Sequence, residues 1–292
     1  MNAYRYQKID AFTSGNSTGN PAACIYLKPG ETLSPDDMLA IARQHKGFVS
    51  EVVYCREEGD GFHLAYYSSE CEVDFCGHGT IACMYSLIRE HGGLLGCSEI
   101  PITTTRKGAL TVYNEIAARD AVFITAPNPL HIGTELDTAT ITGALGAPIV
   151  APSPRLPIDL IDAGLRTLIV PVASLQEAIT LFPDEGVLKE FCLANGIDII
   201  LIYSIEVENP ANKAHTRVFA PKFGYLEDPA TGSGNSAFGY YMLKNGLWDG
   251  ESISLEQGGQ DRVFNRVTLG TRDGLVLFGG GATTRIMGEY FF

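Results

Sequence analysis

An internal repeat is the feature that most constrains the fold of this chain. The segments CGHGTIACMYSLI (residues 76–88) and TGSGNSAFGYYML (231–243) align with a constant shift of 155 residues. The aligned identities are Gly77 with Gly232, Gly79 with Gly234, Ala82 with Ala237, and Tyr85 with Tyr240. Because a similar order of predicted helices and strands surrounds both copies, the repeat predicts two related domains within the 292 residues.

Hydrophobic periodicity and turn residues predict the elements of each half. In the first half we expect a helix over 35–46 capped by Ser34, strands over 49–55 and 62–67, a helix after the first glycine loop to about His91, and strands over 99–105, 109–114 and 121–125. In the second half we expect a helix over 184–195 stopped by Gly196, strands over 198–207 and 215–220, a helix after the second loop to about Asn245, and strands over 251–256, 262–270 and 274–278.

Proline and glycine interrupt the pattern in residues 125–138, where we expect the linker. The expected domains are therefore 1–127 and 128–292, with the last strand free to return to the first domain.

Charge and composition restrict the partners. The net charge of −13 disfavours a nucleic acid or an anionic membrane as a partner. The sequence has no apolar run typical of a signal peptide or a membrane span, which predicts a cytoplasmic protein. The seven cysteines are scattered, without a CxxC or HxxxH pair, so we expect reduced thiols and no zinc site.

Each repeated loop has a composition suited to binding a small anion. Glycines allow the backbone to approach a ligand closely, and the first turn of a helix presents N–H groups that favour negative charge. Two such loops facing each other across one cleft would hold a carboxylate. At this position Cys76 is expected to ionise more readily than an ordinary thiol. The alternative is a buried cysteine beside an ordinary glycine turn.

Glu51 is the candidate base that the residues themselves suggest. Alternation along the strand places it on the same face as Val49 and Val53. A carboxylate on an apolar face is costly unless it is paired, which points to proton transfer. The corresponding segment of the second half, 199–203, contains no acid. The alternative is a glutamate on the exposed side of an edge strand.

An ordered series of short segments resembles the PhzF-like (phenazine-biosynthesis-like) branch of the diaminopimelate epimerase and proline racemase superfamily. The segments, which span residues 9–262, are IDAF (9–12), GNPAA (19–23), SEVVY (50–54), CGHGTIA (76–82), RVFAP (217–221), EDPATGSG (227–234) and EQGGQDR (256–262). The resemblance implies an α+β fold of two pseudo-symmetric diaminopimelate-epimerase-like domains, each a mostly antiparallel sheet wrapped around a central helix. It also implies a homodimeric isomerase that needs no cofactor.

The resemblance also assigns roles to residues. Enzymes of the superfamily use two facing cysteines, but here Thr231 stands opposite Cys76, and its hydroxyl is too basic to serve as the second base. The expected catalytic residues are therefore Glu51, as the proton shuttle, His78 and Asp228. The expected substrate-binding residues are Asn20, Cys76, Gly77, Gly79, Thr231, Gly232, Ser233 and Gly234. No metal is expected.

These features predict an isomerase that moves a proton on a small carboxylate-bearing substrate bound between the domains. Gly79 and Gly234 stand where the PhzF-like branch commonly has alanine, which keeps two alternatives open. One is an epimerase or hydroxy-amino-acid dehydratase that uses Cys76. The other is a non-catalytic binding protein that kept the cleft. For two of the side chains the alternative is a structural role. His78 would bond only to local backbone groups, and Asp228 would be a simple turn residue before Pro229.

Overall fold

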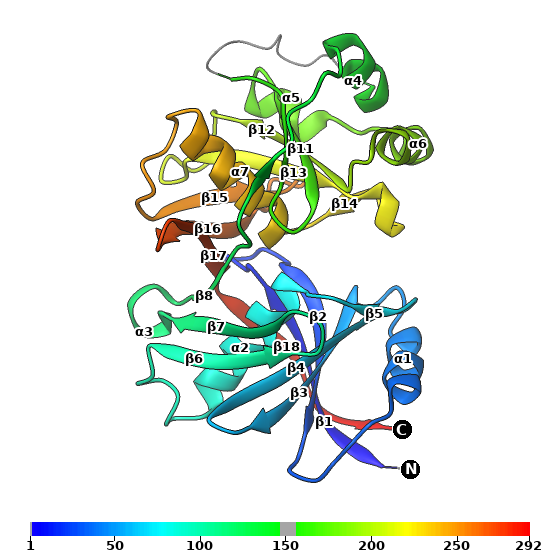
Figure 1. The fold of residues 1–292 in the computed structure, drawn as a ribbon, viewed down its shortest axis with the longest axis vertical. Helices are drawn as coiled ribbons and strands as arrows, with labels where there is room; N and C mark the ends of the chain where they lie inside the picture. Colours follow the sequence, from blue (N-terminus) through cyan, green and yellow to red (C-terminus); the bar gives the residue numbers. More distant parts are fainter. Residues whose placement is uncertain (1, 147–155) are drawn as a thin grey trace. The chain divides into compact units, whose positions relative to one another are not determined.

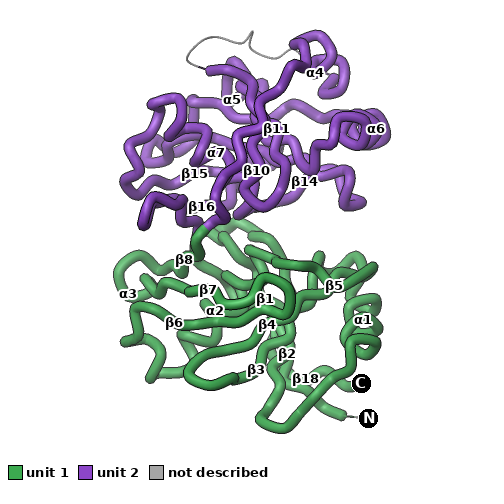
Figure 2. Tube along the Cα trace, in the orientation of Figure 1, with its two compact units in different colours: residues 1–125, 279–292 green, residues 126–278 purple. Residues whose placement is uncertain are grey.

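The computed structural model describes residues 2–146 and 156–292 and forms two compact units (Figure 1). Unit 1 comprises residues 1–125 and 279–292, and unit 2 comprises residues 126–278 (Figure 2). The sequence-based boundary lay at 127/128. The segment expected to be a linker is an ordered part of unit 2, because β9 (Leu130–His131) pairs with β10 (Asp159–Asp162).

Unit 1 is a mixed, mostly antiparallel sheet with three helices. Its strands are β1 (Ala3–Ala11), β2 (Asn20–Leu27), β3 (Glu51–Glu58), β4 (Gly61–Ser68), β5 (Glu72–Val73), β6 (Glu99–Thr104), β7 (Gly108–Asn114), β8 (Val122–Thr125) and β18 (Ala282–Phe291). Its helices are α1 (Pro35–Gln44), α2 (Gly77–Glu90) and the short α3 (Ile116–Arg119). The pairs β2–β3 and β4–β6 are parallel, whereas β1–β2, β1–β18, β3–β4, β4–β5, β6–β7 and β7–β8 are antiparallel.

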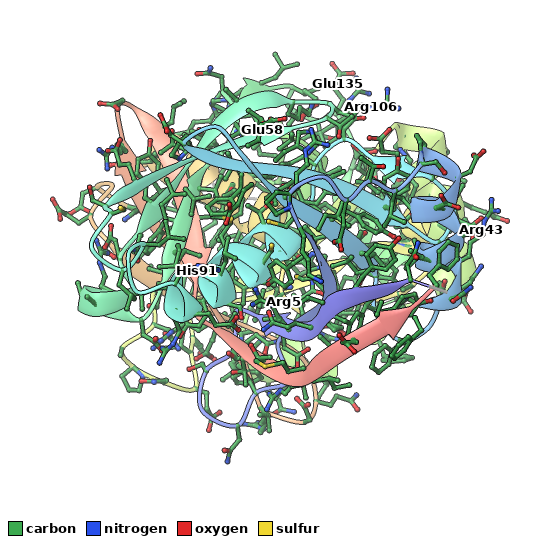
Figure 3. All side chains as sticks on the ribbon, turned by 90° about the horizontal axis from the view of Figure 1, so that it is seen from below. Arg5, Arg43, Glu58, His91, Arg106 and Glu135 are labelled. Carbon is green, nitrogen blue, oxygen red and sulfur yellow. The ribbon has the colours of Figure 1, made fainter. Side chains whose placement is uncertain are left out.

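The helix α2 forms the centre of unit 1. It contacts β1, β2, β3, β8 and β18, and every residue from 79 to 88 is buried. Most of these buried residues are apolar, and the hydroxyls of Thr80 and Ser86 are hydrogen-bonded within unit 1. Its C-terminal turn lies near the surface, where Figure 3 shows His91 at the helix end and Arg5 of β1 beside it. There Arg5 forms an ion pair with Glu90.

The helix α1 covers the opposite face of the same sheet. It begins at Pro35 with a capping box, in which the Ser34 hydroxyl accepts a hydrogen bond from the Asp37 N–H at 3.1 Å. Its buried Ile41 and Ala42 pack against a cluster that includes residues of β1–β4. The predicted Ser34 cap is confirmed.

Unit 2 repeats this architecture. Its strands are β9, β10, β11 (Arg166–Pro171), β12 (Ile199–Ser204), β13 (Ala214–Phe219), β14 (Glu227–Asp228), β15 (Ile253–Gln257), β16 (Asn265–Arg272) and β17 (Leu275–Gly280), the last of which continues into unit 1. Its helices are α4 (Thr138–Leu145), α5 (Leu175–Thr180), α6 (Glu185–Asn195), the 3₁₀ turn η1 (Pro221–Phe223) and α7 (Gly232–Lys244).

Strand pairing shows the pseudo-symmetry directly. The parallel pairs β11–β12 and β13–β15 correspond to β2–β3 and β4–β6, and β9 pairs with β10 as β18 pairs with β1. The residues before α2 and α7 have nearly equal backbone angles, with φ −129° and ψ 105° at Cys76 and φ −121° and ψ 113° at Thr231. The predicted fold of two related α+β domains is confirmed. Among the described residues, no helix is both long and apolar enough to span a membrane.

Candidate active site

Glu51 is the first residue of β3 and points toward the N-terminus of α2. It shares this face with Val53, since a β-carbon added at Gly79 would lie 2.8 Å from Val53 Cγ2. The prediction was wrong for Val49, which packs with Val52 on the α1 face. The strand begins only at Glu51, so the alternation assumed through Ser50 does not hold.

Cys76 is the N-cap residue of α2, and its side chain is held in place by the helix. The Sγ atom accepts a hydrogen bond from the Gly79 N–H at 3.3 Å. The Cys76 carbonyl accepts one from Thr80 Oγ1 at 2.8 Å, and Thr80 Oγ1 lies 2.6 Å from the Tyr66 hydroxyl of β4. The first turn of α2 is thus fixed to the sheet beneath it.

His78 completes a group of three side chains. Its Nε2 atom lies 3.2 Å from Glu51 Oε2, and Cys76 Sγ lies 3.5 Å from His78 Nδ1. The Cys76 thiol also points at Glu51 Oε2, at 3.8 Å. The side chains of His78 and Glu51 are 13% and 16% exposed, so both remain in contact with solvent. The structure therefore brings together three of the predicted site residues.

Burial and charge set the proton affinities in this group. Burial raises the pKa of the Cys76 thiol, the nearby Glu51 carboxylate raises it further, and His78 only partly opposes them. Burial alone would lower the pKa of His78, but Cys76 and the Glu51 carboxylate outweigh it and hold that pKa well above its usual range. The expectation that Cys76 ionises readily is therefore wrong, because burial outweighs the helix N-terminus.

Among the described residues, one group of side chains could hold a metal ion, and it consists of these same three. Their ligand atoms all lie within 4.8 Å of one another. The sequence predicted no zinc site because the usual cysteine and histidine pairs are missing. These ligands instead come from β3 and from the loop before α2, which only the fold brings together.

The second glycine loop, in unit 2, is organised by a different set of contacts. The Thr231 hydroxyl donates a hydrogen bond to Asp228, and both residues are buried. Gln257, on β15, accepts from the Thr231 N–H at 3.0 Å and from Asn235 Nδ2 at 2.7 Å. It also donates to the Asp228 carbonyl at 2.8 Å. Sequence reasoning missed Gln257, although it lies in the matched EQGGQDR segment.

A buried ion pair anchors the strand that leads into this loop. Arg217 is only 1% exposed, and its guanidinium binds both carboxylate oxygens of Glu227, at 2.9 and 2.7 Å. It also donates to the carbonyls of Ala178 and Leu181 at the end of α5. Glu227 directly precedes Asp228, so this pair helps to fix the loop.

The remaining predicted binding residues take separate positions. Gly232 has no room for a side chain, because an added β-carbon would lie 2.3 Å from Phe278 Cε2. Gly234 is buried, Gly77 and Ser233 are partly exposed, and Asn20 is fully buried at the start of β2. Their roles in binding stay predictions. All seven cysteines are free thiols, and of these Cys71 and Cys97 are exposed.

Comparison with known proteins identifies the family. Residues 9–268 match the family model described as phenazine biosynthesis-like protein, PhzC-PhzF. The chain belongs to this family. It is 28% identical over 253 residues to the uncharacterized isomerase YfhB of Bacillus subtilis, covering 86% of this chain and 85% of that protein. It is 25% identical to the uncharacterized isomerase YddE of Escherichia coli K12, covering 91% and 90%. These relatives place the chain among isomerase-type enzymes.

Solved structures of PhzF proteins share the fold. A PhzF-family phenazine biosynthesis protein of Bacillus anthracis has a TM-score of 0.85 at 23% identity, with both chains fully covered. A hydroxyproline epimerase of Agrobacterium vitis with bound trans-4-hydroxy-L-proline has a TM-score of 0.60 at 12% identity, covering 99% of this chain and 91% of that chain. The predicted resemblance is confirmed at the level of family and fold.

Proposed function

We propose that the protein is a cofactor-independent isomerase in which Glu51 removes a proton from a carbon atom of a small carboxylate-bearing substrate and returns it at another position. One observation carries this proposal. The Glu51 carboxylate lies 3.2 Å from His78 Nε2, at the N-terminus of α2, in a site that stays partly exposed. A positioned carboxylate with a cationic neighbour suits general acid–base catalysis.

Each neighbour of Glu51 has a distinct role in this proposal. His78 carries positive charge beside Glu51 and stabilises the negative charge that develops on the substrate. The N-terminus of α2 adds positive partial charge at the same place. The Cys76 thiol, whose pKa is raised by burial, stays protonated and lines the site.

We extend the proposal to the second glycine loop. Asp228, Thr231 and Ser233 bind the substrate in it, and Asp228 takes part in catalysis. Support comes from the repeated geometry, since Thr231 occupies the N-cap position of α7 with nearly the same backbone angles that Cys76 has at the N-cap position of α2. Replacing Asp228 by Asn is expected to lower the turnover number and to raise the Michaelis constant, whereas a turn-forming role alone would change only stability.

A second candidate function uses Cys76 as the base. Cys76 Sγ lies within 3.5 Å of His78 and 3.8 Å of Glu51, and either group could accept its proton. This arrangement would serve an epimerase or a hydroxy-amino-acid dehydratase. Burial of the thiol and its raised pKa argue against a thiolate at neutral pH.

Deuterium uptake tests both candidates. The protein, Glu51→Gln and Cys76→Ala are incubated in D2O with a panel of cyclic and amino carboxylic acids, and substrate mass is followed by mass spectrometry. Uptake that is lost only in Glu51→Gln supports the proposal. Uptake lost only in Cys76→Ala assigns the reaction to the thiol. Binding of a panel member without any exchange at any pH identifies a binding protein.

We further propose that the protein works in biosynthesis as a cytoplasmic homodimer. Family membership and the seven free thiols support this assignment. Sedimentation velocity at micromolar concentration checks the assembly, and a purely monomeric species would contradict it.

A further inference from the structure

Three different metal-ligating atoms surround a single point at the N-terminus of α2. Glu51 Oε2 and His78 Nε2 are 3.2 Å apart, and Cys76 Sγ lies 3.8 Å from each of them. The point equidistant from the three atoms is about 2.1 Å from each, which matches the zinc–ligand distances of about 2.0–2.3 Å for oxygen, nitrogen and sulfur. The three groups thus lie within reach of one ion. Because Cys76 Sγ lies closer to His78 Nδ1, at 3.5 Å, than to Nε2, the imidazole must turn before one of its nitrogen lone pairs faces that ion.

Without an ion, hydrogen bonds hold the three groups together, because His78 Nε2 lies 3.2 Å from Glu51 Oε2 and His78 Nδ1 lies 3.5 Å from Cys76 Sγ. The contact of the sulfur with Glu51 Oε2, at 3.8 Å, is longer than its contact with His78 Nδ1. The Gly79 N–H, at 3.3 Å, also holds the Sγ atom, and this contact does not depend on Glu51 or His78. An ion can therefore be bound by a turn of the His78 ring, with the first turn of α2 and the sulfur left in place.

The ligand set favours a soft divalent cation. Thiolate and imidazole select zinc over magnesium or calcium, which require more oxygen ligands. A thiolate, a carboxylate and a neutral imidazole together balance the charge of Zn²⁺. The Gly79 N–H would remain bonded to the sulfur and orient it, as outer-shell donors do in zinc sites. Partial exposure of Glu51 and His78 leaves a route for the ion and a fourth position for water.

We propose that Glu51, Cys76 and His78 form a reversible Zn²⁺ site that switches the enzyme off. Zinc binding displaces the thiol proton and a proton on His78 to water, and the metal takes the carboxylate that would otherwise abstract the substrate proton. The inhibitory effect rests on the proposed function, whereas metal binding itself does not.

Cobalt spectroscopy tests the site without any substrate. Co²⁺ is titrated into the full-length chain carrying Cys71→Ser and Cys97→Ser, which removes the two exposed thiols. We expect one equivalent of Co²⁺ to bind with a thiolate-to-cobalt charge-transfer band and intense tetrahedral visible bands, and Zn²⁺ to displace it. Adding Cys76→Ser should abolish the charge-transfer band. Glu51→Gln or His78→Gln should weaken binding by at least about 10-fold, as even loss of an outer-shell partner does.

Circular dichroism and thermal melting confirm that each variant is folded, and Glu51→Gln preserves the shape of the side chain. A charge-transfer band that persists in Cys76→Ser, or no saturable cobalt binding, would overturn the proposal. Binding without any deuterium exchange in the enzyme assay would overturn only the proposed function. Where exchange occurs, Zn²⁺ should stop it and a chelator should restore it, and exchange that continues with zinc bound would overturn the inhibitory role.

Discussion

Cys76 and Thr231 occupy the N-cap positions of corresponding helices, yet their side chains have different partners. Cys76 Sγ lies among Glu51, His78 and the Gly79 N–H, so its chemistry is tied to titratable groups. The Thr231 hydroxyl is bonded to Asp228, which ties it to its own loop. The duplicated position has therefore diverged in its contacts, with Cys76 beside Glu51 and His78 and with Thr231 bonded to Asp228. A symmetric two-thiol mechanism does not fit these residues.

Gly79 controls where the Cys76 thiol lies. A β-carbon at this position would lie 2.8 Å from Val53 Cγ2 and 2.9 Å from Cys76 Sγ, both closer than real contacts allow. We expect Gly79→Ala to lower the free energy of unfolding by about 1–3 kcal/mol through overpacking and to displace the thiol. Urea unfolding and the rate of Cys76 alkylation measure both effects. Gly92→Ala is the control, since nothing lies within 4 Å of its added carbon, and equal effects in the two variants would contradict the prediction.

Substitution of Arg217 measures how much its buried ion pair with Glu227 contributes to the stability of the protein. Replacing it with Met would leave Glu227 and two carbonyls at the end of α5 without their donor. We expect Arg217→Met to reduce the free energy of unfolding by about 3–5 kcal/mol. Arg262, which pairs with Glu208 at a site where both side chains are about half exposed, provides the matched control. Arg262→Met should reduce the free energy of unfolding by less than about 1 kcal/mol. Urea unfolding of the two variants measures both losses.

At the scale of elements, Glu256 joins β15 to the loop after β12. Its carboxylate accepts hydrogen bonds from the N–H groups of Glu208 and Asn209, at 2.7 and 3.1 Å, and from the Asn212 side chain at 2.7 Å. It also lies 3.2 Å from His215 Nδ1. Burial alone would raise the pKa of Glu256, but these donors outweigh it and hold the pKa below its usual value.

This lowered pKa makes the stability of unit 2 depend on pH. A carboxylate with a lower pKa in the folded state stabilises the fold above its unfolded pKa, and the contribution is lost as the pH falls through the folded value. We expect Glu256→Gln to be less stable than the unmodified protein at pH 7 by about 1.5–3 kcal/mol, with the gap shrinking toward pH 3. Urea unfolding across this range measures the gap. Glu190 is exposed, and Glu190→Gln should change the free energy of unfolding very little at any pH. A stability difference for Glu256→Gln that stays constant with pH would contradict the prediction.

Elements with strong local signals were predictable from the sequence, and the others depend on long-range contacts. The helix α6 has an Asp184 cap and a left-handed Gly196, both visible in the sequence. The strand β18 has no such pattern, because residues 284–289 are all exposed and its pairing partner β1 lies at the other end of the chain. The sequence also indicated Glu51, Cys76 and His78 separately. Their convergence needs β3 packed beside α2, and the contacts of Gln257 need β15 beside the second loop.

At the scale of the whole molecule, the chain leaves unit 1 after residue 125 and returns at residue 279. The reason lies in the duplication. In unit 2, β9 precedes its partner β10 in the sequence, whereas in unit 1 the corresponding strand β18 comes from the C-terminus and pairs along the whole of β1. Residues 1–125 alone would expose nine residues of β1 and part of α2. Unit 1 is thus a complete domain only with its last strand.

A protein in which residue 125 is joined to residue 279 tests whether unit 1 folds with its last strand alone. The return point is near the exit point within unit 1, because Gly279 lies against Val122, and a β-carbon added at Gly279 would be 2.1 Å from the Val122 carbonyl oxygen. A short glycine–serine linker can therefore join residue 125 to residue 279. We expect residues 1–125 joined to 279–292 to fold cooperatively, with dispersed amide NMR signals and a single urea transition. Residues 1–125 alone should lack both, because the edge of β1 is unpaired. If the fused protein is as disordered as the truncated one, unit 1 also requires unit 2, and the two halves are not independent domains.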